Sequence, residues 1–321
     1  CSELQSVTWN CTCDVIPANC FFECSNLTHF DFSAIKKIEK YSFSRSGLQE
    51  VSFPENIKII EEGTFKECSG LRSVAWNCTC DVIPALCFYM CPNLTNFDFS
   101  SIKKVGQYAF VESGLQEVCL QKNIEILEDG TFSRCNGLRS VTWNCTCDVI
   151  PNFCFAVCSN LTNFDFSGIK KIGKYAFKES GLQEVWLSES IKNIEEGTFK
   201  ECSGLRSVTW NCTCDVIPAS CFAFCSNLTQ FDLSGIKKVG TSAFEKSGLT
   251  SVTLSKGTIV CKKCFVHCKS LAKVEWLSAR NIEGNIFAGC KNIKEICISD
   301  KVKNIEASAF ASSPNAEITF I

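Results

Sequence analysis

Apolar residues recur along this chain in triplets with steps of three and then two positions, and each triplet opens on leucine. The first three triplets are Leu4, Val7, Trp9; Leu27, Phe30, Phe32; and Leu48, Val51, Phe53. The last two members alternate as in a β-strand with one buried face. A second motif, Ile-x-x-x-(Ala/Thr/Ser)-Phe, follows each triplet, as from Ile38 to Phe43. We expect it to form the opposite wall of the core, with a tight inner position at the small residue.

The triplets are spaced 23, 21 and 23 residues apart, and these spacings add to a longer period of 67 residues. Trp9, Trp76, Trp143 and Trp210 mark that period, and each opens the phrase Trp-Asn-Cys-Thr-Cys-Asp-Val-Ile-Pro. Trp276 opens a fifth, weaker copy without those cysteines. A fixed period predicts a solenoid, in which each unit contacts only its neighbours. We expect one solenoid domain over 1–321 with about fourteen units, arranged as superrepeats at about 1–67, 68–134, 135–201 and 202–267 and divergent repeats at 268–321.

Two segments show the unit most clearly. Lys170 to Leu187 reads KKIGKYAFKESGLQEVWL, and Phe199 to Val208 reads FKECSGLRSV, with a cysteine before the anchoring leucine. This pattern resembles the BspA-type (Treponema-type) leucine-rich repeat over essentially the whole chain. The resemblance implies a leucine-rich-repeat solenoid with a parallel β-sheet on the concave face and short strands, turns and 3-10 segments on the convex face. It also implies a surface-exposed adhesion protein, as members of that family typically are.

Composition and charge exclude several classes of function. The formal net charge of −2 gives no support for a nucleic-acid partner. No apolar run approaches the ~20 residues of a membrane span, and a chain that starts at Cys1 is expected to be mature, truncated or trimmed. The two histidines, His29 and His267, lie outside any repeated constellation, and no nucleophile elbow, phosphate loop or metalloprotease motif occurs. We therefore predict no enzyme activity and no cofactor. The recurring lysine pairs and acidic pairs are expected in solvated turns.

The chain has 26 cysteines, which follow the same period with five in each block. Cys68 and Cys91 precede an anchoring leucine, and Cys87 falls at the small inner position, so most of the set is expected in or beside the core as small apolar side chains. Cys119 and Cys297 instead replace Ser52 at an outward strand position and are candidates for exposed thiols.

The competing interpretation is a disulfide ladder, because so many cysteines are typical of an oxidising compartment. Cys78 with Cys87, or Cys80 with Cys87, are the first pairings to expect. The candidates are Cys11, Cys13, Cys20, Cys78, Cys80, Cys87, Cys145, Cys147, Cys154, Cys212, Cys214 and Cys221. Zinc is a third interpretation, but the spacing departs from the paired Cys-x2-Cys knuckle, and we predict no metal site.

Asn-x-Thr sequons occur twice in each block. The Asn-Cys-Thr series comprises Asn10, Asn77, Asn144 and Asn211, and the Asn-Leu-Thr series comprises Asn26, Asn93, Asn160 and Asn227. Copying of one accidental sequon would also give such a series. Together with the cysteines, the two series favour a glycosylated protein outside the cell or at its surface. The Asn-Cys-Thr series is the better candidate, since its asparagine lies just beyond the strand.

One outward side chain lies between the inward residues of each predicted strand, and these side chains include Asp31, Asp98, Asp165 and Asp232 at every third strand. Trp186 takes the same position in one strand, whereas the other tryptophans align with core phenylalanines. A polar sheet with regular charges can bind a long or repetitive ligand by avidity, although a merely solvated face has the same composition. The candidate ligand-binding residues are Asp98, Asp165, Arg139, Arg206 and Trp186.

The sequence therefore predicts an adhesion-type protein that binds protein or glycan ligands on its sheet face. The alternative is a structural protein that assembles end to end into a filament through uncapped solenoid termini. It rests on the first unit, whose apolar triplet from Leu4 to Trp9 has no preceding coil, and on the strand-like AEITFI that ends at Ile321.

Overall fold

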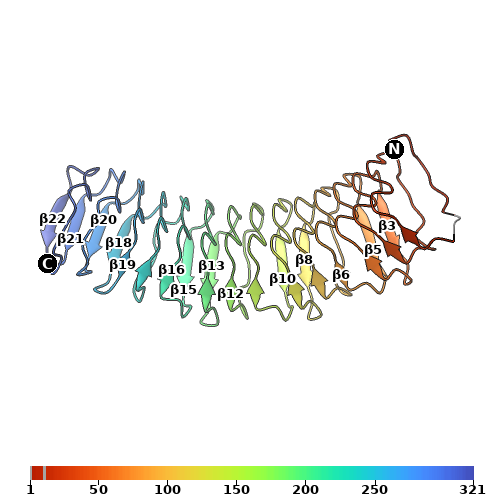
Figure 1. Ribbon diagram of the computed structural model, residues 1–321. Coiled ribbons are helices and arrows are strands. Elements are labelled where there is room, and N and C mark those ends of the chain that lie inside the picture. Colours follow the sequence, from red (N-terminus) through yellow and green to blue (C-terminus); the bar gives the residue numbers. More distant parts are fainter. Residues whose placement is uncertain (1, 10–11) are drawn as a thin grey trace. The chain divides into compact units, whose positions relative to one another are not determined.

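The computed structural model describes residues 2–9 and 12–321 and divides into two compact units, Cys1–Leu161 and Thr162–Ile321. Each unit is a parallel β-solenoid, and the described residues contain strands and turns but no helix (Figure 1). Consequently, no helix in the described part of the chain could span a membrane. The parallel β-solenoid expected from the period is confirmed within each unit, whereas one continuous domain over 1–321 stays a prediction.

Within residues 2–9 and 12–161, the first unit contains eleven strands, which have either four residues or two. They are β1 (Val15–Ile16), β2 (Lys37–Ile38), β3 (Glu50–Phe53), β4 (Ile59–Ile60), β5 (Ser73–Trp76), β6 (Val82–Ile83), β7 (Lys104–Val105), β8 (Glu117–Leu120), β9 (Ile126–Leu127), β10 (Ser140–Trp143) and β11 (Val149–Ile150).

The second unit also contains eleven strands and ends in a continuous run of longer ones. They are β12 (Lys171–Ile172), β13 (Glu184–Leu187), β14 (Asn193–Ile194), β15 (Ser207–Trp210), β16 (Val216–Ile217), β17 (Lys238–Val239), β18 (Ser251–Leu254), β19 (Ile259–Val260), β20 (Lys273–Trp276), β21 (Glu295–Ile298) and β22 (Glu317–Phe320).

The strands form two kinds of parallel sheet in each unit. The four-residue strands make one wall, here called the long-strand face, with the pairs β3–β5 and β8–β10 in the first unit and the sheets β13–β15 and β18–β20–β21–β22 in the second. The two-residue strands make a second wall, with β1–β2–β4 and β6–β7–β9 in the first unit and β12–β14 and β16–β17–β19 in the second. Turns form the third wall, here called the turn face.

The long strands arise from the predicted alternation. In β3, Val51 and Phe53 point inward and are buried, while Glu50 and Ser52 point outward and are exposed. Leu48, which opens this triplet, is fully buried. Adjacent strands pair residue for residue, so that Phe53 lies opposite Trp76 and the apolar sides of neighbouring coils stack.

Strands are absent, however, from one predicted position in every block. The triplets that start at Leu27, Leu94, Leu161 and Leu228, and the first triplet at Leu4, form no strand in the part of the chain that the structure describes. The first four are the coils that carry the outward aspartates. In each, the aspartate carboxylate accepts a hydrogen bond from the backbone N–H two residues on, as Asp98 does from Ser100. This Asx-type turn competes with the strand ladder, so the expectation of a strand in every coil was wrong.

On the turn face, successive backbone N–H groups donate alternately to the next coil and within their own coil. The Phe21 N–H donates to the Ser42 carbonyl of the next coil at 2.8 Å, whereas the Phe22 N–H donates within its own coil to Asn19 at 3.1 Å. The same alternation recurs in later coils, for example at Phe43 and Ser44. Each coil is therefore tied to its neighbour by main-chain hydrogen bonds on the turn face, as well as by the sheets.

The turn face contains no 3-10 helix within residues 2–9 and 12–321, so that part of the predicted convex wall was wrong. Its turns instead hold two left-handed residues four positions apart, such as Tyr41 (φ 55°) and Arg45 (φ 57°). Such residues interrupt a helical run, since a 3-10 helix needs consecutive right-handed residues. The glycine version occurs at Gly63 (φ 63°).

Stacked phenylalanines fill the core beneath the turn face. From Phe21 to Phe155 in the first unit, consecutive rings lie 5.1–5.8 Å apart with interplanar angles of 7–27°. From Phe177 to Phe310 in the second unit, the spacing is 5.4–5.9 Å and the angle 7–18°. The small residue before each ring from Phe43 to Phe265 is buried, as at Thr64, which confirms the tight inner position in these coils, whereas Cys20 before Phe21 is exposed.

Candidate functional site

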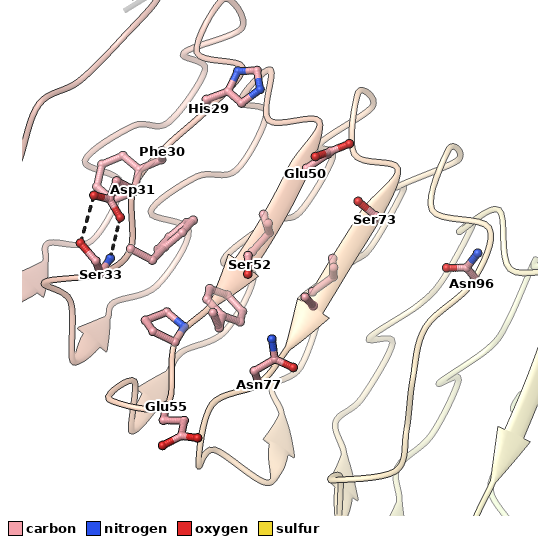
Figure 2. A pocket seen from close by; sticks show the side chains of 16 residues that line it. His29, Phe30, Asp31, Ser33, Glu50, Ser52, Glu55, Ser73, Asn77 and Asn96 are labelled. Carbon is pink, nitrogen blue, oxygen red and sulfur yellow. Dashed lines mark hydrogen bonds between the residues drawn. The ribbon is translucent and has the colours of Figure 1, made fainter.

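The outward side chains of the long-strand face line a hollow of about 740 Å³ in the first unit (Figure 2). Glu50 and Ser52 of β3 lie on its floor beside Asp31 of the preceding coil, and Asn77 closes it after β5. The Asp31 carboxylate accepts hydrogen bonds from the Ser33 N–H at 2.9 Å and from its hydroxyl at 3.0 Å. The hollow therefore presents carboxylates, hydroxyls and the amides of Asn77 and Asn96, which are groups that can hydrogen-bond an extended polar ligand.

Related hollows occur along both units. In the first unit, one of about 730 Å³ lies over Trp76 and Asn77 of the β5 end and beside Asp98. In the second unit, one of about 530 Å³ is lined by Arg206, Asp232 and Thr253 with several serines. Each hollow includes a coil in which the strand is replaced by the aspartate turn. Sequence reasoning did not find these hollows, although the aspartate two residues before a serine was a readable signal.

The outward position of the predicted aspartates is confirmed, and Asp98 and Asp165 are both exposed. Each also accepts a hydrogen bond at 2.9 Å from the N–H two residues on, Ser100 or Ser167, so each supports its own turn. Part of their hydrogen-bonding capacity is thus used locally, and the remainder faces outward.

Trp186 occupies the outward position of β13 with 54% of its surface exposed. It pairs in register with Thr209 of β15, and Asp165 lies in the coil before it. A large apolar ring that is exposed between polar neighbours is unfavourable in water, and an exposed tryptophan of this kind is typical of a binding hot spot. The sequence-based prediction that this ring points outward is confirmed.

The other tryptophans meet the core expectation only in part. Trp76 and Trp276 are buried, but Trp143 and Trp210 are half-buried, so for these two the expectation of a core position was too strong. The indole N–H donates to the carbonyl four residues on, for example from Trp210 to Cys214 at 2.8 Å.

Arg139 and Arg206 are exposed just before β10 and β15. Neither guanidinium forms an ion pair with any described carboxylate, so both are available to an anionic partner. In the second unit, Asp165, Trp186 and Arg206 come from three consecutive coils of one face. In the first unit, a coil that includes β8 separates Asp98 from Arg139.

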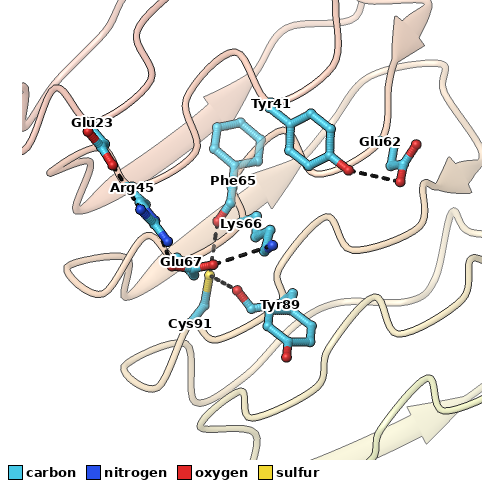
Figure 3. A network of polar contacts seen from close by, with 9 residues as sticks. All are labelled: Glu23, Tyr41, Arg45, Glu62, Phe65, Lys66, Glu67, Tyr89 and Cys91. Atoms are coloured by element: carbon cyan, nitrogen blue, oxygen red, sulfur yellow. Dashed lines mark hydrogen bonds and ion pairs between the residues drawn. The ribbon is translucent and has the colours of Figure 1, made fainter. Parts of the chain in front are cut away.

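Most of the cysteine side chains that the structure describes are buried. Cys68, Cys91 and Cys135 are fully buried, as predicted for the position before the leucine. The Cys91 thiol donates to the carbonyl of Phe65 in the preceding coil at 3.2 Å (Figure 3). The same bond joins Cys68 to Phe43 at 3.0 Å. Burial raises the pKa of Cys68 to about 11 and that of Cys135 to about 12, which keeps both as thiols that can donate.

The Cys-Thr-Cys pairs lie nearer the surface. Cys145 and Cys147 are half-buried thiols, and a hydrogen bond from Cys147 lowers the pKa of Cys145 and raises its own. Cys78, Cys80 and Cys87 are also thiols in the structure. Their pairing into disulfides stays a prediction, and Cys11 lies outside the described residues. Cys119 is exposed and Cys297 half-buried, as expected for outward positions.

No metal site is preformed in the part of the chain that the structure describes, because no group of three or more His, Cys, Asp or Glu side chains is arranged to hold an ion. The exposed His29 imidazole lies 3.0 Å from the Thr28 hydroxyl on the long-strand face, and exposed His267 lies on the turn face. Among the described residues, no carboxylate is hydrogen-bonded to either imidazole, so neither forms a nucleophile–base–acid triad.

The two sequon series differ in their surroundings. Asn77, Asn144 and Asn211 are exposed, and Asn10 lies outside the described residues. The Asn-Leu-Thr series is exposed as well, but the Asn93 amide donates to the Ser69 carbonyl of the preceding coil at 2.7 Å, and Asn160 donates in the same way. Asn93 and Asn160 therefore join neighbouring coils, which supports the preference for the first series as glycan acceptors.

The charged turns are paired across coils. Lys36 meets Asp14 at 2.9 Å, and the equivalent Lys237 meets Asp215 at 2.8 Å. Lys37 lies 3.0 Å from Glu61 on the next coil. Exposed pairs of this kind add little stability each. They mark the short-strand wall as a solvated surface, in agreement with the expectation for the lysine and acid pairs.

Comparisons with known proteins agree with this architecture. A leucine-rich repeat protein from Bacteroides ovatus has a TM-score of 0.59 at 20% identity, over 89% of this chain and 88% of that protein. A leucine rich cell surface protein from Faecalibacterium prausnitzii has a TM-score of 0.50 at 19% identity, over 89% and 83% of the two chains. A leucine-rich repeat protein from Eubacterium ventriosum has a TM-score of 0.50 at 18% identity, over 94% and 81%. At this identity the likeness shows the fold alone.

No curated protein matches the chain. The family model described as "BspA type Leucine rich repeat region (6 copies)" matches it in four overlapping stretches, 1–114, 81–205, 149–272 and 258–321, which together span all of it. This confirms the resemblance that the repeat motifs indicated. The chain belongs to the BspA-type leucine-rich repeat family.

Proposed function

We propose that the protein is an adhesion-type binding protein at the cell surface or outside the cell, whose long-strand face takes protein or glycan ligands. The observation that carries the proposal is Trp186, an apolar ring 54% exposed on an otherwise polar face. Asp165 before it and Arg206 after it provide charges of both signs within three consecutive coils. Hollows lined by hydroxyls, carboxylates and amides extend the surface within each unit.

The mechanism would be multivalent. A stacking ring provides apolar contact, and the neighbouring polar groups fix orientation, which is the usual division of labour at a hot spot. Because the outward aspartates recur with the 67-residue period, a repetitive ligand could engage several weak subsites at once. The cell-surface description of the Faecalibacterium relative is consistent with this setting.

The test is an array of glycans and extracellular-matrix proteins probed with the purified chain and with a Trp186→Ala/Asp165→Asn variant. Asparagine keeps an oxygen for the Ser167 N–H, so the variant loses the charge and the ring but not the turn. We expect ligands captured by the wild type to be lost. Asp215→Asn, which removes the same charge from the short-strand wall, is the matched control and should bind normally. Equal capture by wild type and variant would remove the site from this face.

A second candidate function is self-association through β22. Ile318, Phe320 and Ile321 are 49%, 62% and 57% exposed, and β22 is the edge strand of its sheet, paired with β21. An exposed apolar edge strand is a template for pairing with another chain. Sedimentation at rising concentration tests it: assemblies that lengthen, and that Phe320→Lys abolishes, would support filament formation. A monomer at every concentration would exclude it.

A further inference from the structure

The turn face of the first unit carries a neutralised charge triad. The second left-handed residues of three successive coils are Glu23, Arg45 and Glu67. The Arg45 Nη1 lies 2.8 Å from Glu23 Oε1, and its Nε lies 2.7 Å from Glu67 Oε2 (Figure 3). The arginine is thus held between two carboxylates, and little of its charge is left for a partner.

The same three positions in the fourth superrepeat have a different chemistry. They are occupied by Phe224 (φ 65°), Lys246 (φ 54°) and His267 (φ 58°). The Lys246 ammonium lies 4.7 Å from the centre of the Phe224 ring. An aromatic ring attracts a cation without cancelling its charge. No described carboxylate pairs with Lys246, so the ammonium is positioned but not neutralised.

A third basic group completes this corner. Lys269 follows His267 by two residues, where the other superrepeats have Ser69, Asn136 or Ser203. Its ammonium also has no carboxylate partner among the described residues. Together with Ser226, Ser270 and Gly248, the three basic side chains line a hollow of about 570 Å³, here called the basic hollow. Lys246, His267 and Lys269 are all exposed.

The charge of the surrounding segment reinforces the basic hollow. Residues 237–321 contain 13 lysines and arginines against 7 acidic residues, whereas residues 1–236 contain 19 against 27. Although the net charge of the whole chain is near zero, its C-terminal quarter is therefore basic. A local field of one sign raises the concentration of oppositely charged ligands and their association rate.

We propose that the basic hollow, formed by Lys246, His267 and Lys269, binds the sulfate groups of an anionic glycan. Ammonium groups and serine hydroxyls can donate hydrogen bonds to the oxygens of a tetrahedral sulfate ester. An ammonium group acts as a point charge and, unlike a guanidinium group, does not need a planar acceptor arrangement. The open, shallow form of the hollow suits a substituent on a flexible chain. A nucleic acid is disfavoured, because the residues that line the hollow include no arginine fork and no phenylalanine, tyrosine or tryptophan ring on which a base could stack. This site is separate from the long-strand face and does not depend on its function.

The experiment measures the affinity of the full chain for a sulfated heparin-derived hexasaccharide by calorimetry. Lys246→Gln/Lys269→Gln should weaken binding about a hundredfold or more, since it removes two charge-assisted hydrogen bonds. Lys122→Gln/Lys192→Gln removes the same charge from two exposed lysines elsewhere and should bind like the wild type. Unchanged affinity in the first variant, or equal loss in the control, would overturn the proposal.

A second variant tests the geometry instead of the charge alone. Phe224→Glu/His267→Glu rebuilds the triad of the first superrepeat around Lys246, at backbone angles that glutamate already adopts at Glu23 and Glu67. Both lysines remain, yet hexasaccharide binding should be lost because Lys246 is neutralised.

The desulfated hexasaccharide should not bind the wild type. A single-stranded oligonucleotide that binds as tightly as the sulfated sugar would contradict the glycan assignment. The Trp186→Ala/Asp165→Asn variant should keep full hexasaccharide affinity, which separates this site from the proposed adhesion face.

Discussion

Removal of one ring from the phenylalanine stack should greatly lower the free energy of unfolding of the coils around it. Phe132 is fully buried, with the rings of Phe110 and Phe155 stacked on either side, each 5.7 Å away. The Phe99 ring meets it edge-on at 5.9 Å. Phe132→Ala should therefore lower the free energy of unfolding by about 3–5 kcal/mol, of which the lost aromatic contacts account for ~0.5–1.5 kcal/mol each.

The assay is urea unfolding followed by far-ultraviolet circular dichroism. Because coils of a solenoid contact only their neighbours, a weak interior coil should split the transition into separate steps. Phe153→Ala is the matched control: its ring belongs to the same unit but is 38% exposed, and its loss should cost clearly less, about 1–2 kcal/mol. A cost below about 1 kcal/mol for Phe132→Ala, or equal costs for both variants, would refute the stacked core.

Three further predictions follow from the thiols, the ion pairs and the sequons. In native protein at pH 8, iodoacetamide should label exposed Cys119 readily and buried Cys135 only after unfolding, because burial raises the pKa of Cys135 to about 12; rapid native labelling of Cys135 would contradict its burial. The hydrogen bond and charge of Lys237 lower the pKa of Asp215. The stability that this pair contributes is present above the unfolded-state pKa of Asp215 and is lost as the pH falls through its folded-state pKa. Lys237→Met should thus lose less stability than wild type between about pH 5 and pH 3 in acid titrations, and identical pH profiles would exclude this linkage. On secretion from a eukaryotic host, peptide mass spectrometry should find the Asn-Cys-Thr sequons glycosylated before the Asn-Leu-Thr sequons, whose amides at Asn93 and Asn160 are hydrogen-bonded; the reverse order would contradict the assignment.

Much of the fold could be predicted because the core is periodic. Alternating inward residues such as Val51 and Phe53 follow from strand geometry alone, and the burial of Cys68 and Cys91 follows from their alignment with the leucine. The outward position of Trp186 was readable for the same reason. Each of these depends only on which side of the chain faces the core.

What could not be predicted depends on local hydrogen bonding. The coil from Leu94 has the same apolar triplet as a strand, but Asp98 accepts the Ser100 N–H and the ladder is lost. The left-handed pairs on the turn face use ordinary residues such as Tyr41 and Arg45, which give no glycine signal. The basic hollow was visible only as a departure of one superrepeat from the others, which becomes meaningful once the turn positions are known to be neighbours.

The most direct measurement is the dissociation constant of wild type and Trp186→Ala for the tightest ligand found on the array, by surface plasmon resonance. A hot-spot ring contributes about 2 kcal/mol or more, so the adhesion-face account predicts at least about thirtyfold weaker binding, with Trp186→Phe retaining most of the affinity. Dissociation constants within about twofold for all three proteins would show that the long-strand face around Trp186 is not the binding surface.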